Sequence, residues 1–442
     1  MVLLLNLKFK YWFSMRSNVK DLLLILNEWW EREAISRDKA REYRRKIFPI
    51  ILDTFNRYRQ IIILTGLRRV GKTTLMFQII ENLLKQGVNA RKIFYYSFDE
   101  MVEDPIKVLN EYSKITKVDW RREKVFLFLD EVHKLRNWSS KVKLLYDNLP
   151  NLRICISGSA SLLVEEEDFR NLAGRYFLFE IPPLTLQEYG ELYFGRKIDS
   201  YEIYCSRLET ILDDYIRKPF PEIVKWTDIA RVNEYIRTLI IEKIVRTDIP
   251  QAFQGINISL LSTLTEIFMR DVGAILNLTS LARDLRVHKL TLRKHLKLLE
   301  YGKIFRIVKN YRPSIRAETR KLPKIYPFHI ALAYCFYPEL TKGQIYETLV
   351  ATALNLHKYW RQGNREIDFL KINKEITPIE VKAREKISNK EIKNLLKFME
   401  KNSLKKGIVI YTGRELEEKT IKQKIILLYP LIKLLYNFKL DT

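Results

Sequence analysis

A glycine-rich segment that ends in a lysine and two threonines is the first feature of the sequence that could do chemistry. Residues 66–73 read GLRRVGKT and match G-x-x-x-x-G-K-[ST] at every fixed position. In such a loop, successive backbone N–H groups face phosphates, the lysine reaches the β- and γ-phosphates, and the last hydroxyl takes a magnesium position. We therefore expect the loop to bind ATP with magnesium. The residues expected to do so are Gly66, Leu67, Arg68, Arg69, Val70, Gly71, Lys72, Thr73 and Thr74.

Two adjacent carboxylates could complete this site. Asp130 and Glu131 follow directly on the five apolar residues 125–129, a position where a neutral turn would be more usual. We expect Asp130 to hold the magnesium together with Thr73, and Glu131 to orient and deprotonate the attacking water. Within the loop, Arg68 and Arg69 could neutralise phosphate or form outward salt bridges, and the sequence leaves both open.

The elements that must position these residues alternate between strand and helix. Apolar runs of strand length occur at 61–66, 92–98, 125–131 and 152–159, with helical or polar segments between them. The glycine-rich loop lies directly between the first of these strands and a helical segment. Such alternation predicts an α/β fold, a P-loop NTPase parallel sheet with helices on both faces.

A helix-turn-helix is predicted in the second half. A short helix at 278–285, a tight turn and a second helix at 289–300 have the usual spacing, and Ala282 lies where the two helices must approach closely. The basic segment 304–324 could form a wing. A mechanical three-helix module is the alternative to DNA contact. The side chains expected to face DNA are Lys289, Thr291, Arg293, Lys294 and Lys297.

Three carboxylates and a lysine near the end could bind a metal. Asp368 and Glu380 could share a second divalent ion, Mg²⁺ or Mn²⁺, with Glu347 as a further ligand. Lys382 lies two residues after Glu380, on the same face of a strand, where it could stabilise negative charge. This order resembles the PD-(D/E)xK nuclease superfamily, although the leading proline is absent. The pattern is short, and a nuclease-like fold without cleavage stays open.

The motifs GLRRVGKTTLM, FLDEVH, ISGSASLL and LAGRYFLFEIPPLTLQEY resemble the archaeal and bacterial AAA-type ATPases of the AAA_14 class, which often carry a DUF4143-type C-terminal domain. The resemblance is specific over about residues 20–190. It implies that the strand ending at 157–159 is the sensor strand, with Ser159 as the favoured residue. It also implies that Arg175 senses or stabilises transition-state charge, which could be that of a neighbouring subunit's nucleotide; a structural ion pair is the alternative.

Five segments are expected from these patterns. They are an N-terminal helical segment (1–45, read as helical from 15), the P-loop ATPase core (46–181), a helical lid (182–260), a winged helix-turn-helix (261–335) and a small α/β nuclease-like domain (336–442). Translation could start at Met1 or Met15.

The composition bears on partners and location. A formal charge of +25 favours a polyanionic partner, most often DNA. Three widely spaced cysteines favour a reducing cytoplasm, and no apolar run approaches the roughly 20 residues that span a bilayer. The favoured interpretation is an ATPase that binds DNA, with a homo-oligomer possible. An ATP-regulated signalling switch and an ATP-dependent nuclease are the alternatives.

Overall fold

The computed structural model describes residues 18–158, 170–253 and 255–440, so that the prediction for Ser159 lies outside the described residues. The chain forms two compact units. The first unit is Met1–Gly66 with Gly71–Pro182, and the second is Leu67–Val70 with Pro183–Thr442. The middle of the glycine-rich loop is thus assigned by its contacts to the second unit.

The first unit is built on a five-stranded sheet in the order β2-β3-β4-β1-β5. Every strand pair in it is parallel, which confirms the α/β prediction. The strand β4 lies between β1 and β3, so that the ends of these three strands meet at one edge. The strands are β1 (Ile61–Thr65), β2 (Ile93–Ser97), β3 (Val125–Asp130), β4 (Leu152–Ser157) and β5 (Tyr176–Glu180).

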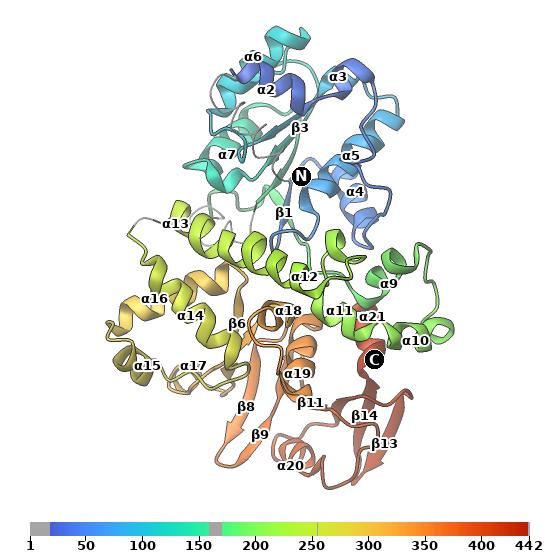
Figure 1. Cartoon of the computed structure of the whole chain (residues 1–442), viewed down its shortest axis with the longest axis vertical. Helices are drawn as coiled ribbons and strands as arrows, with labels where there is room; N and C mark the ends of the chain where they lie inside the picture. Colours follow the sequence, from blue (N-terminus) through green and yellow to red (C-terminus); the bar gives the residue numbers. More distant parts are fainter. Residues whose placement is uncertain (1–17, 159–169, 254, 441–442) are drawn as a thin grey trace. The chain divides into compact units, whose positions relative to one another are not determined.

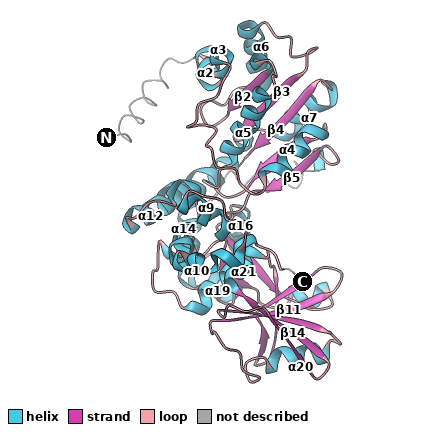
Figure 2. Ribbon diagram, turned by 90° about the vertical axis from the view of Figure 1, so that its right-hand side faces the viewer, coloured by secondary structure: helices cyan, strands magenta, loops and turns pink. Residues whose placement is uncertain are grey.

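Helices cover both faces of this sheet (Figure 2). Alternate strand residues point to opposite faces: Leu127 packs in the core cluster that includes α2, α6 and α7, whereas Phe128 faces Phe55 of α4. The strands are apolar on both faces because both faces are covered. The helices are α2 (Val19–Leu26), α3 (Trp29–Arg32), α4 (Phe48–Arg57), α5 (Lys72–Lys85), η1 (Ala90–Lys92), α6 (Pro105–Thr116), η2 (Val132–Lys134) and α7 (Trp138–Asn148).

The segment before the first strand covers the edge strand β2. Before α4 begins at Phe48, it is helical only to Arg32, and not throughout 15–45 as expected among the residues described there. The Asn27 side chain donates to the Tyr95 carbonyl (2.9 Å) and accepts from the Tyr95 N–H (2.7 Å). The indole N–H groups of Trp29 and Trp30 both donate to the Ile93 carbonyl. Side chains thus satisfy backbone groups that an edge strand would leave unpaired.

The second unit begins with helices that match the expected loss of strand signal after residue 182. Its central helical stretch contains two π-helical segments, η5 and η6, and such segments are rare and often lie at functional sites. The elements are α9 (Leu186–Phe194), α10 (Tyr201–Thr210), α11 (Leu212–Arg217), η4 (Pro221–Ile223), α12 (Ile229–Tyr235), η5 (Ile236–Glu242), η6 (Ile244–Asp248) and α13 (Ile249–Ala252).

Three helices and an antiparallel hairpin follow. Helices α14 (Ile258–Arg270), α15 (Leu278–Asp284) and α16 (Lys289–Tyr301) precede strands β6 (Phe305–Asn310) and β7 (Lys324–Pro327). An isolated bridge joins Ile275 to Lys324, and the hairpin connection carries a short helix, α17 (Ile315–Thr319). This is the element order that the helix-turn-helix spacing predicts, with the hairpin in the place of the wing.

The remaining elements form two sheets. The four-stranded sheet β7-β6-β8-β9 joins strands from both sides of the expected boundary at 335/336, and the five-stranded sheet has the order β10-β11-β12-β14-β13 (Figure 1). The elements are α18 (Ala331–Tyr334), α19 (Lys342–Ala353), β8 (Lys358–Gln362), β9 (Arg365–Ile367), β10 (Phe369–Ile372), β11 (Ile376–Lys382), α20 (Lys393–Lys401), β12 (Lys406–Tyr411), β13 (Glu417–Ile421), β14 (Lys424–Pro430) and α21 (Leu431–Asn437).

Candidate functional site

The glycine-rich loop leaves the carboxyl end of β1 and enters α5, and its two glycines are required for different reasons. Gly66 has φ 143°, and a Cβ there would lie 2.4 Å from the carbonyl oxygen of Ile181. Gly71 has φ 97° and caps α5, and a Cβ there would meet no atom within 4 Å. The first glycine permits close packing on the neighbouring backbone, and the second lies beside open space at the positive end of a 14-residue helix.

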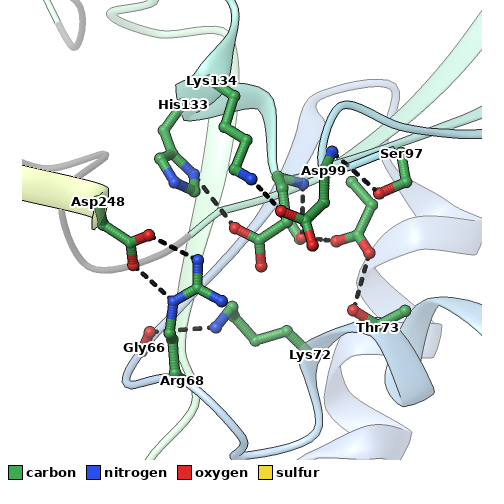
Figure 3. Close-up of polar contacts among 12 residues, drawn as sticks. Gly66, Arg68, Lys72, Thr73, Ser97, Asp99, His133, Lys134 and Asp248 are labelled. Carbon is green, nitrogen blue, oxygen red and sulfur yellow. Dashed lines mark hydrogen bonds and ion pairs between the residues drawn. The ribbon is translucent and has the colours of Figure 1, made fainter. Parts of the chain in front are cut away.

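The side chains of Lys72 and Thr73 lie on the same first turn of α5 (Figure 3). The Lys72 ammonium is buried and donates to the carbonyl of Gly66 at 3.2 Å, so it folds back over the loop. The Thr73 hydroxyl donates to Asp130 Oδ2 at 2.8 Å. The structure therefore joins the predicted hydroxyl and the predicted carboxylate directly.

Asp130 is buried at the carboxyl end of β3 and accepts three hydroxyl hydrogen bonds. Thr73 and Tyr95 (2.9 Å) donate to Oδ2, and Ser157 donates to Oδ1. Burial raises the pKa of Asp130, as does the charge of Glu131, while the three hydrogen bonds oppose this rise. Burial and the Asp130 charge raise the pKa of Tyr95 well above its usual range, which keeps it a donor.

Glu131 follows Asp130 in a left-handed backbone conformation with φ 54°. Its N–H donates to Ser157 Oγ at 3.3 Å, which links the ends of β3 and β4. Its Oε2 atom is buried and makes no hydrogen bond within the described residues, although it lies 3.2 Å from Nδ1 of His133.

These residues fit a nucleotide with its magnesium. Magnesium in such sites takes one or two carboxylates, keeps several waters and completes its shell with phosphate oxygens. One carboxylate (Asp130) and one hydroxyl (Thr73) at the start of α5 provide this donor set, beside the open space at Gly71. Among residues 18–158, 170–253 and 255–440, no group of three or more His, Cys, Asp or Glu side chains could hold a metal by itself.

The loop arginines form ion pairs within the second unit. Arg68 makes a bidentate contact with Asp248 at the end of η6, with Nε–Oδ2 at 2.5 Å and Nη2–Oδ1 at 2.6 Å (Figure 3). Arg69 pairs with Glu222 at 3.0 Å. Of the two possibilities that the sequence left open, the structure shows the salt bridges.

Arg175 lies at the amino end of β5, whereas the phosphate loop follows the carboxyl end of the parallel strand β1. Its guanidinium pairs with Asp147, with Nε–Oδ1 at 2.7 Å. The parallel register places Arg175 at the opposite edge of the sheet from this chain's own loop. A role on a neighbouring subunit's nucleotide stays a prediction.

All five side chains expected to face DNA are exposed on α16 or at its start: Lys289, Thr291, Arg293, Lys294 and Lys297. The opposite side of the helix is buried through Leu292, Leu296 and Leu299, and Ala282 of α15 is buried as expected. Lys289 also donates to the Thr279 hydroxyl at 2.9 Å. The helix thus has one basic face and one packed face.

The C-terminal carboxylates also come together. Asp368 lies at a break between β9 and β10, and it accepts from the Val381 N–H at 2.8 Å. Lys382 contacts Glu380 at 2.6 Å and lies 4.0 Å from Asp368. The other oxygen of Glu380 is buried without a hydrogen bond in the described chain. Burial and the charge of Asp368 raise the pKa of Glu347 to about 7.

An ammonium therefore neutralises Glu380 where a metal was expected, and the described residues offer no three-ligand metal group. The four predicted residues lie together, with the Lys382 ammonium on one Glu380 oxygen and the other oxygen buried without a hydrogen-bond partner in the described chain.

Sequence reasoning missed several residues of these sites. Tyr95 and Asp248 belong to no motif. The alternation of side chains along β2 puts Tyr95 and Ser97 on the same face, and this is the one signal that could have indicated Tyr95. Ser157 was recognised only as the start of the sensor segment. Asp99 and Lys134 form an ion pair beside the site (Figure 3).

Comparison with known families identifies three regions. Residues 58–190 match the AAA_14 family, described as "AAA domain". Residues 210–339 match DUF8612 and residues 342–431 match DUF4143, both domains of unknown function.

Relatives of this chain include two uncharacterized proteins of Methanocaldococcus jannaschii. MJ1637 is 26% identical over 435 residues, covering 89% of this chain and 90% of the relative. MJ1544 is 25% identical over 388 residues, covering 83% and 85%. An uncharacterized protein of Haemophilus influenzae is 26% identical over 258 residues, covering 57% of this chain and 62% of the relative.

Solved structures with partial likeness include the Walker-type ATPase PABY2304 of Pyrococcus abyssi, with a TM-score of 0.37, 15% identity and coverage of 67% of this chain and 97% of that chain. The replication initiator DnaA bound to AMPPCP and single-stranded DNA has a TM-score of 0.27, 16% identity and coverage of 58% and 87%. By its family matches and its own sheet and loop, this chain carries an AAA domain of the AAA_14 class and a C-terminal DUF4143 domain.

Proposed function

We propose that this protein binds and hydrolyses ATP with magnesium. The observation that carries the proposal is the direct hydrogen bond between Thr73 and Asp130, because a hydroxyl and a carboxylate in contact at the first turn of α5 are ligands that magnesium accepts. The open space beside Gly71 supports it, since phosphate would meet backbone N–H groups there.

The residues of the site have distinct roles in this proposal. Lys72 exchanges the Gly66 carbonyl for phosphate oxygens, and Asp130 with Thr73 holds the magnesium, which supplies charge neutralisation of the phosphates. Glu131 orients the attacking water and accepts its proton. Ser157 fixes the Asp130 carboxylate and the Glu131 backbone together.

ATP binding and turnover by the full chain test this proposal. Lys72→Ala should abolish turnover and weaken nucleotide binding, whereas Glu131→Gln should abolish turnover while nucleotide binding persists. Equal turnover by the parent and both variants would remove the proposed roles. A Lys85→Ala variant, which alters an exposed lysine at the far end of α5, serves as the matched control and should behave as the parent.

We further propose that DNA contacts the exposed face of α16. Its basic side chains lie opposite a packed face, and the formal charge of +25 favours a polyanion. Duplex binding should weaken steeply with salt, and Arg293→Ala or Lys294→Ala should each lower the slope of log K against log salt by about 1. ATP turnover with and without single-stranded, duplex and branched DNA tests whether the two activities are coupled. A flat salt response would exclude the contact.

Metal-dependent DNA cleavage is a second candidate function, supported by the convergence of Glu347, Asp368, Glu380 and Lys382 and by the unpaired oxygen of Glu380. Cleavage with manganese that Asp368→Ala eliminates would support it. No cleavage of any DNA, together with no divalent-ion binding that depends on Asp368, would leave this cluster a structural ion network.

A further inference from the structure

A pocket of about 370 Å³ in the second unit lies between the β8–β9 hairpin and one face of α20. Trp360 of β8 and Phe398 of α20 form its apolar part, with their ring centroids 4.9 Å apart. Its volume is within the range of small-molecule sites. The pocket has no lining residue in common with the phosphate loop, with α16 or with the acidic cluster.

Three cations line this pocket: Arg365, Lys397 and Lys401. Lys401 donates to Gln362 at 2.9 Å and lies 6.0 Å from the centre of the Trp360 ring. No carboxylate lines the pocket or pairs with any of the three cations within the described part of the chain.

Neighbouring cations behave differently, which shows that carboxylates are available nearby. Arg361, Lys324 and Lys358 each pair with a glutamate: the first two with Glu366, the third with Glu318. On α20 itself, Glu400 lies 3.7 Å from Lys422. These acidic groups are therefore engaged elsewhere, and none of them pairs with the three cations of the pocket.

The chemistry of the lining selects a ligand class. Uncompensated cations favour phosphate, an aromatic face favours stacking of a planar base, and three carboxamide side chains, Gln362 among them, can pair with the edge of a base. An acidic peptide would use the cations but not the ring face. We infer that this pocket binds one nucleotide unit, with its base stacked at Trp360 and its phosphate among the three cations.

Such a nucleotide can be free or part of a single strand. The inference extends the proposed nucleic-acid contact to a second site, and it depends on neither ATP hydrolysis nor α16. Photocrosslinking locates the contact directly, so its result is separable from both of those proposals.

The experiment uses the full-length Lys72→Ala chain, in which the phosphate loop is disabled, with two probes. One is an eight-nucleotide single strand that carries a central 5-iodouracil, and the other is 5-iodouridine monophosphate. After irradiation, peptide mass mapping should place the crosslink within residues 358–365 or 393–401. Crosslinking by the strand alone identifies nucleic acid as the source, and crosslinking by the monophosphate identifies a free nucleotide.

Variants measured by fluorescence anisotropy with the same strand give the magnitude. Loss of the stacking ring in Trp360→Leu should weaken binding about 5- to 150-fold. Arg365→Ala and Lys397→Ala should each reduce the salt slope by a part of about 0.7, the value for one phosphate of a single strand. Arg365→Ala and Lys397→Ala leave the packed rings of Trp360 and Phe398 intact. They therefore keep the test valid if Trp360→Leu does not fold.

Lys374→Ala is the matched control, because Lys374 is an exposed cation in the β10–β11 turn of the same region and does not line the pocket. It should bind as the parent does. Crosslinks confined to 289–301, an equal effect of Lys374→Ala and Lys397→Ala, or no binding of either probe would each overturn the inference. ATP turnover of the chain with Lys72 restored is unaffected by any of these outcomes.

Discussion

Replacing Asp248 with alanine should destabilise the second unit and loosen the phosphate loop at the same time. The Asp248 side chain is 1% exposed and accepts two hydrogen bonds from Arg68, whose side chain is 14% exposed. Removing one partner of a buried ion pair typically costs about 3–5 kcal/mol. Arg68 can still reach some water, so we expect about 3 kcal/mol for Asp248→Ala. Arg68→Ala isolates a fully buried carboxylate and should cost about 5 kcal/mol.

A double-mutant cycle by denaturant unfolding measures this pair. The double variant should lose less stability than the sum of the losses in the two single variants. It removes both partners of the ion pair, so that no buried charge is left unpaired. The exposed pair on the next residue, Arg69 with Glu222, is the matched control, with side chains 43% and 51% exposed. Its coupling should be about 0–1 kcal/mol. Equal coupling energies for the two pairs would refute the argument from burial.

The same variant tests whether this contact organises the loop. Because residues 67–70 lie in the middle of the loop, Asp248→Ala should raise the free energy needed to order it for phosphate. A cost of about 1.4 kcal/mol corresponds to roughly tenfold weaker ATP binding, measurable by calorimetry. Unchanged or tighter ATP binding by Asp248→Ala, with the chain still folded, would show that the ion pair does not preorganise the loop.

Three further outcomes are expected. Gly66→Ala should lower the melting temperature more than Gly71→Ala does, because both positions have positive φ but only the first alanine would meet the Ile181 carbonyl, at 2.4 Å; equal losses by thermal melting would contradict this. Tyr95→Phe removes one charged hydrogen bond from the buried carboxylate of the site and should cost about 1.5–3 kcal/mol by denaturant unfolding, a result that a loss below 0.5 kcal/mol would exclude. Burial raises the pKa of Glu347 to about 7, so the folded chain holds this proton more tightly than the unfolded chain does. The free energy of unfolding should therefore fall from about pH 4.5 to 7 and then level off. In EDTA, Glu347→Gln should flatten this fall, and an unchanged pH profile of that variant would contradict the assignment.

The features that the sequence predicted well are those encoded in consecutive residues. The segment 66–73 and the pair Asp130–Glu131 each carry their chemistry within one turn, and the alternation of apolar runs predicted the parallel sheet. The closeness of Thr73 and Asp130 agrees with these predictions, because the carboxyl ends of parallel strands meet at one edge of a sheet, although β4 lies between β1 and β3.

The features that could not be predicted depend on partners far apart in the chain. Arg68 and Asp248 are 180 positions apart, and nothing in the local pattern around either residue indicates the other. Asn27 lies in a segment expected to be a plain helix, yet its amide pairs with both backbone groups of Tyr95. Such contacts depend on tertiary packing, to which local propensity is a weak guide.

The four-stranded sheet of the second unit connects the proposed nucleic-acid contacts to each other. Strand β6, which follows α16, pairs in parallel with β8, which carries Trp360 of the pocket. Strand β9 then leads from Arg365 to Asp368 within three residues. Hydrogen-bonded strands thus fix the distance between α16, the pocket and the acidic cluster.

A strand of nucleic acid that contacts both α16 and the pocket would therefore bind as a bivalent ligand. Once the strand is bound at one site, its effective concentration at the other site would be high, because a sheet and not a flexible linker separates α16 from the pocket. For a strand long enough to reach both sites, the double variant Lys294→Ala/Lys397→Ala should then lose affinity by a larger factor than a short oligonucleotide would indicate. The comparison is with the product of the two single-variant effects, measured on an oligonucleotide too short to reach both sites. Affinity that is equal for short and long strands in the parent chain would show that the two surfaces bind independently.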